Sequence, residues 1–173
     1  MKLWLARIAK GLLVAFLLIQ VIRPDKTNPV EDPLLSIERV SKPPREISEI
    51  LNRSCMDCHS HRSRWPWYSQ VAPVSWYVID HVKEARMHVN FSTWGAEKPE
   101  DRNEMLEDMC KEVKAGAMPI ESYTWMHEGT SLMEAQRQAL CAWTDSERKK
   151  TSSENGKSSS SEEKPDDHSG HKH

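Results

Sequence analysis

The most chemically active group of residues in the chain is the run from Cys55 to His59, which reads Cys-Met-Asp-Cys-His. Two cysteines separated by two residues and followed directly by a histidine form the attachment pattern of c-type haem. The thiols of Cys55 and Cys58 would form thioethers with the two vinyl groups of one haem. The imidazole of His59 would bind the iron from one side. The run therefore predicts one covalent haem c.

Two other uses of a C-x-x-C pair have to be weighed. A redox dithiol of the thioredoxin kind follows a strand–helix–strand pattern, which the chain does not show. A structural zinc site needs a second ligand pair at a compatible spacing, whereas Cys110 and Cys141 stand far apart. The adjacent histidine and the export-like N-terminus favour haem. Cys110 and Cys141 could form one disulfide or remain two free thiols.

The ligand on the other face of the iron would decide the chemistry. Met118 is the first choice, because it precedes Pro119 in a loop that follows Gly116. A thioether ligand raises the reduction potential and suits electron transfer. His81 and His127 are the rival ligands, and an open iron is the remaining alternative.

Aromatic and basic residues near the cysteine motif are candidates for contacts with a haem. The chain has seven Trp and only two Phe, a bias that suits the walls of a flat macrocycle as well as an ordinary core. Trp67 and Tyr68 would pack on the porphyrin edge and offer an N–H and an O–H group. Guanidinium groups bind carboxylates well, so the haem propionates could pair with a set of three arginines: Arg62, Arg64 and Arg86.

The N-terminus resembles an export segment. Lys2, Arg7 and Lys10 precede an apolar run over residues 11–22 that is short for a full membrane span. Because no small-residue cleavage site follows, we expect residues 1–22 to be an uncleaved signal anchor rather than a cleaved signal peptide. This predicts a single-pass protein of a bacterial inner membrane, with its haem domain in the periplasm or exterior.

The rest of the chain divides by composition into three parts. Residues 23–45 contain five prolines and predict an extended linker. Residues 46–148 show helical periodicity and no strand alternation, with helices expected from Pro44, over residues 74–89, from Pro99 to Gly116 and over residues 132–148. Residues 149–173 form a polar tail that we expect to be disordered, with a histidine-containing end that could bind a metal weakly. The predicted fold is all-α, a small cytochrome c-like bundle of four to five helices around one haem.

Several longer blocks resemble the bacterial haem-binding domain family. They are CMDCHSHRSRWPWYSQVAPVSW, NFSTW, GAMP and ALCAW, and together the resemblance covers about residues 18–145. It implies covalent haem c in a mostly helical, usually membrane-anchored domain, and it leaves the partner and the reaction open.

These observations predict a membrane-tethered monohaem cytochrome that carries single electrons between redox partner proteins. No paired carboxylates, phosphate-binding loop or Ser/His/Asp arrangement indicates a substrate site, so an electron carrier is favoured over an enzyme. A haem-based sensor or ligand-binding module is the alternative, and a peroxidase-like enzyme is a further one. A net charge of −2 gives no electrostatic case for nucleic acid.

Overall fold

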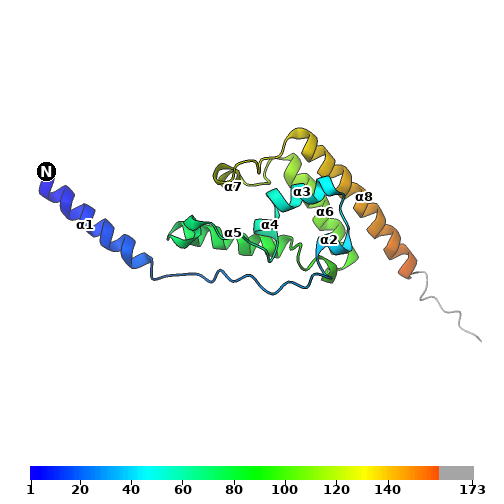
Figure 1. The fold of residues 1–173 in the computed structure, drawn as a ribbon, viewed down its shortest axis with the longest axis horizontal. Helices are drawn as coiled ribbons and strands as arrows, with labels where there is room; N and C mark the ends of the chain where they lie inside the picture. The colour runs from blue at the N-terminus through cyan, green and yellow to red at the C-terminus, as the bar shows by residue number, and fades with distance from the viewer. Residues whose placement is uncertain (160–173) are drawn as a thin grey trace, which may run out of the picture. The chain divides into compact units, whose positions relative to one another are not determined.

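The computed structural model describes residues 1–159, with residues 154–159 described by their backbone alone. All regular structure in this range is helical, which confirms the predicted all-α class (Figure 1). The chain forms two compact units, one of residues 1–95 and one that begins at Ala96. The elements are α1 (Lys2–Ile19), α2 (Ile37–Val40), α3 (Arg45–Ser54), α4 (Met56–His59), the 3-10 turn η1 (Trp67–Gln70), α5 (Val74–His88), the 3-10 turn η2 (Trp94–Ala96), α6 (Pro99–Lys114), α7 (Glu121–Met126) and α8 (Glu134–Ser159).

The core of the first unit comes from helices that the sequence predicts. Ile47, Ile50 and Leu51 recur at helical spacing, and all three are buried on α3. Ile79 and Val82 are the buried aliphatic residues of α5. The helix α4 contacts both α3 and α5, so the cysteine motif lies at the centre of this unit.

Helix α1 corrects the predicted location of the protein. The helix has 18 residues, which span about 27 Å at 1.5 Å each, and it contains Lys2, Arg7 and Lys10. No helix within residues 1–159 is long and apolar enough to cross a membrane. The expectation of a single-pass inner-membrane protein with its haem domain in the periplasm or exterior is therefore wrong.

The proline-rich segment is docked on the first unit, which differs from the extended linker predicted for residues 23–45. We call residues 20–41 the strap. Its Ile37 is fully buried and donates its backbone N–H to Phe91 O at 2.8 Å. The side-chain amide of Gln20 bonds both the N–H and the carbonyl of Ala72, at 2.9 and 3.0 Å. In both contacts the partners are more than fifty residues apart in the sequence. Local periodicity therefore could not reveal the docking.

The second unit is built on α6 and α8, which lie side by side (Figure 1). A disulfide between Cys110 and Cys141 joins the two helices, which settles the alternative left open by the sequence. Pro99 is the first residue of α6, as predicted. Gly116 follows the last turn of α6 with φ of 72°, the left-handed conformation that glycine adopts without a steric penalty.

Helix α8 differs from its prediction at both ends. It begins at Glu134 rather than Leu132, and the side chain of Gln136 caps its start by accepting the N–H of Met133 at 3.0 Å. The helix then continues to Ser159, beyond the predicted end at residue 148. Three residues of the predicted metal-binding tail lie outside the described residues: His168, His171 and His173.

Candidate functional site

The cysteine motif occupies a sharp change of direction between two helices. Cys55 has φ of −128° and ψ of −41°, and it both ends α3 and caps the start of α4. Its carbonyl accepts the N–H groups of Cys58 and His59 at 3.1 and 3.0 Å. This single turn brings two half-buried free thiols to positions three residues apart, which face the same side of a helix.

The ring of His59 is held by the C-terminal end of α5. Its Nδ1 lies 3.1 Å from Ala85 O and 3.1 Å from Val89 O, and Phe91 donates its N–H to His59 O at 2.8 Å. Two carbonyl acceptors fix the proton on Nδ1, which leaves the lone pair of Nε2 for a metal. Burial lowers the pKa of His59, which favours the neutral form of the ring.

The two thiols are held in their protonated form. Burial raises the pKa of Cys55 to about 12, and the neighbouring Cys58 adds to the shift. Burial also raises the pKa of Cys58 to about 11, with a further contribution from Asp57. Reactive redox dithiols have lowered thiol pKa values, so this environment is unlike theirs.

The loop that follows the motif folds back onto α4. Ser60 Oγ donates to Met56 O at 2.6 Å, and Ser63 Oγ donates to Asp57 O at 2.5 Å. The guanidinium of Arg64 bonds both carboxylate oxygens of Asp57, at 3.0 and 3.1 Å. The position of residue 64 is therefore tied directly to the motif.

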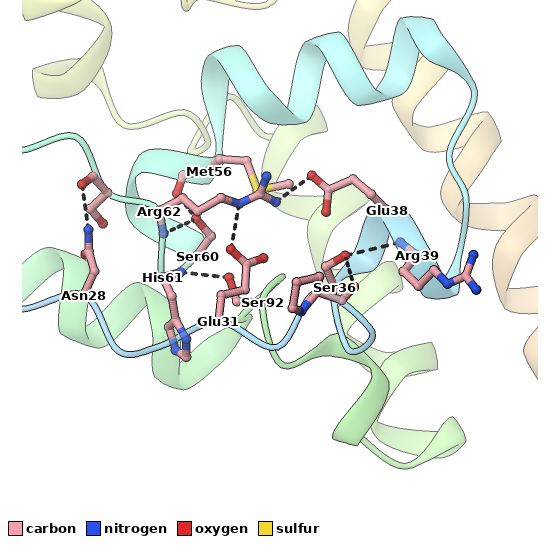
Figure 2. Close-up of polar contacts among 12 residues, drawn as sticks. Asn28, Glu31, Ser36, Glu38, Arg39, Met56, Ser60, His61, Arg62 and Ser92 are labelled. Atoms are coloured by element: carbon pink, nitrogen blue, oxygen red, sulfur yellow. Dashed lines mark hydrogen bonds and ion pairs between the residues drawn. The ribbon is translucent and has the colours of Figure 1, made fainter.

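The strap supplies partners for Arg62, one of the arginines predicted to bind propionates. Figure 2 shows its guanidinium between two strap carboxylates, Glu31 at 3.2 Å and Glu38 at 2.6 Å. The same group lies 3.7 Å from the sulfur of Met56, inside the cysteine motif. Arg62 thus connects the strap to the motif in this structure.

Arg86 is also engaged by protein groups. It donates to Ser60 O at 2.8 Å, to Ser63 Oγ at 2.9 Å and to the strap residue Asn28 at 2.8 Å. Arg62, Arg64 and Arg86 therefore all donate to protein groups in this structure.

The aromatic residues after the motif differ in their surroundings. The predicted haem contact Trp67 is 74% exposed and packs edge-on against Tyr68 at 5.9 Å between ring centroids. Burial raises the pKa of Tyr68, with smaller contributions from Cys58 and Asp57. Trp65 was not singled out by its sequence position, yet its indole nitrogen is buried without a hydrogen-bond partner.

The candidates for the second axial ligand lie on different elements. Met118 belongs to the second unit and is half-buried, and its N–H donates to Glu112 O at 3.2 Å. Nδ1 of His81 lies 2.9 Å from Tyr77 O, and Nδ1 of His127 lies 2.9 Å from Tyr123 O. An iron bond from either histidine would have to be made by Nε2. The choice of Met118 stays a prediction.

The comparison with known families decides the class of protein. The profile of a family described as the haem-binding domain matches residues 14–146. The chain belongs to the haem-binding domain family. No curated protein and no solved structure matches the chain.

The residues of this haem-binding domain fit the cofactor that its family name specifies. Cys55 and Cys58 offer two free thiols, and His59 offers an Nε2 that is not needed for the contacts of its Nδ1 with backbone carbonyls. Among the side chains that the structure describes, those of residues 1–153, no group of three or more His, Cys, Asp and Glu is placed to hold a metal ion. An iron already held in a macrocycle needs only axial ligands from the protein.

Proposed function

We propose that this haem-binding domain is a c-type cytochrome that carries single electrons between redox partner proteins. The observation that supports the proposal most strongly is the geometry at the motif. Cys55 and Cys58 have free thiols and lie in one turn with His59. The Nδ1 of His59 is held by two backbone carbonyls. This is the arrangement needed for covalent attachment together with an axial imidazole.

The attachment would consume only the two thiols and the two vinyl groups. The sulfur of Cys55 would bond one carbon of a vinyl group, and the thiol hydrogen would add to the other carbon of the same vinyl group. Cys58 would add to the second vinyl group in the same way. When bound, haem supplies an iron that alternates between the ferrous and ferric states by taking up or releasing one electron. His59 would hold the iron from one side, and the carbonyls of Ala85 and Val89 would keep its ring from turning.

Met118 is the proposed ligand on the other side. Its loop is short and internally fixed, because Ala117 and Met118 both donate their N–H groups to Glu112 O. A bound thioether keeps other ligands off the iron, which suits a carrier rather than a sensor or a peroxidase.

Mass spectrometry of the protein made with the cytochrome c maturation machinery tests the attachment. We expect the denatured wild-type protein to retain the mass of one haem, and the double variant Cys55→Ser/Cys58→Ser to retain none. A wild-type protein that loses its haem on denaturation would refute the covalent proposal and leave a haem-binding domain of another type.

Absorption spectra test the second ligand. Met118→Ala should abolish the weak long-wavelength band of a methionine-bound ferric haem, while Met126→Ala, a half-exposed methionine nearby, should keep it. A high-spin wild-type protein that binds carbon monoxide would instead indicate an open iron and favour a sensor or ligand-binding module.

A further inference from the structure

The side chain of Trp65 carries the one buried indole N–H that lacks a hydrogen-bond partner within the described residues. An indole N–H only donates, so a second protein donor or a cation cannot satisfy it. A buried donor without a partner destabilises the fold, and in native proteins such a group is normally satisfied by another protein group, an ordered water or a bound ligand. Trp65 therefore points to an acceptor that the polypeptide does not supply.

The position of Trp65 places this donor beside the attachment motif. The preceding residue, Arg64, is bound to the Asp57 carboxylate through both its backbone N–H and its guanidinium. On the other side of Trp65, the ring of Tyr68 is close enough to Cys58 and Asp57 for their charges to affect its ionisation. Arg64 thus contacts the cysteine motif directly, and Tyr68 interacts with it electrostatically.

The guanidinium groups nearby already have acceptors in the protein, whereas the indole N–H of Trp65 has none. Arg62 is paired with Glu31 and Glu38, and Arg64 is paired with Asp57. Arg86 uses its guanidinium on the strap and on the loop after the motif. A haem attached at Cys55 and Cys58 brings two carboxylates, which are strong acceptors for a buried N–H.

We propose that Trp65 donates its indole N–H to a propionate carboxylate of the attached haem. This inference rests on the proposed function, because it requires a haem at the motif. It makes Trp65 a cofactor-binding residue, whereas the neighbouring Trp67 has its side chain mainly in solvent. The bond would favour the ionised propionate and so lower its pKa.

The test compares two matched variants of the haem-loaded full chain, Trp65→Phe and Trp67→Phe. Each variant keeps an aromatic ring and removes one indole N–H. The readout is the reduction potential as a function of pH, because ionisation of a propionate stabilises the ferric state and lowers the potential. The midpoint pH of this fall in potential is set by the pKa of the propionate. We expect it to be about one pH unit higher in Trp65→Phe than in the wild-type protein. It should not change in Trp67→Phe.

Nuclear magnetic resonance of the reduced wild-type protein gives a second test, which does not depend on the variant folding. We expect nuclear Overhauser contacts between the indole N–H of Trp65 and the propionate methylene protons. A haem-loaded protein without these contacts, or with the same pH profile in both variants, would overturn this inference and leave the proposed function intact. A wild-type chain without covalent haem, as judged by mass spectrometry, would overturn both.

Discussion

Ile37 offers the sharpest test of the docked strap. Its side chain is fully buried although it lies among the prolines that predict a linker. Replacement by alanine removes three carbons, and at about 0.8 kcal/mol for each buried CH₂ the transfer cost is about 2.4 kcal/mol. The cavity left behind adds to this cost, so we expect the free energy of unfolding to fall by about 3 kcal/mol.

Leu34→Ala is the matched control for Ile37→Ala. It removes the same number of carbons from the same segment, but the Leu34 side chain is 67% exposed. We expect its effect to stay within about 0.5 kcal/mol. Denaturation in urea, followed by circular dichroism and by haem absorbance, gives the midpoints for both variants in the haem-loaded full chain.

Equal midpoints for Ile37→Ala and Leu34→Ala would refute the docked strap and restore the undocked linker. Should Ile37→Ala fail to accumulate in folded form, Ile37→Val is the milder substitution, with an expected loss of about 1 kcal/mol.

Three other changes test contacts within one unit or the other. Reduction of the disulfide between Cys110 and Cys141, which are 31 residues apart, should cost the second unit about 3.7 kcal/mol from loop entropy, and circular dichroism with and without reductant measures it. Gly95→Ala places a methyl group 3.2 Å from the strap backbone and should lose about 1–3 kcal/mol in urea denaturation, whereas Gly11→Ala meets nothing within 4 Å and should not. Arg62→Gln removes two partly exposed ion pairs and should cost about 1 kcal/mol, with a smaller loss in concentrated salt; a loss independent of salt would contradict the ion-pair explanation.

The sequence predicts the helices well where local chemistry determines them. The periodic apolar residues of α5 predict its extent, and the structure ends this helix at His88, one residue before the expected limit. Pro99 and Gly116 mark the two ends of α6 because proline fits the first turn and glycine tolerates the left-handed conformation after the last. These features need no knowledge of the rest of the fold.

The strap could not be predicted because its stabilising contacts are remote in sequence. Gln20 bonds Ala72, and Leu35 accepts the N–H of Gly95 at 2.8 Å, across tens of residues. The short helix α2, which begins at the Ser36 cap, has too few residues to show periodicity. The prolines disfavour a long helix there, but this does not distinguish the predicted extended linker from a docked segment.

The cysteine motif predicted the centre of the candidate site but not its surroundings. The residue types at positions 55, 58 and 59 predict the attachment chemistry without any other part of the chain. The support for His59 comes from the carbonyls of Ala85 and Val89, and backbone carbonyls carry no sequence signal. Trp65 and Trp67 are likewise indistinguishable in the sequence, and only the structure separates the buried indole N–H from the exposed ring.

The docking of the strap has a consequence for biosynthesis. Because the ribosome makes the chain from its N-terminus, the strap emerges before its partners in the rest of the first unit, which extend to Gly95. Closing such long loops is a slow, late event compared with forming helices. The thiols of Cys55 and Cys58 are therefore made before the first unit can close around them, so both are accessible in the nascent chain.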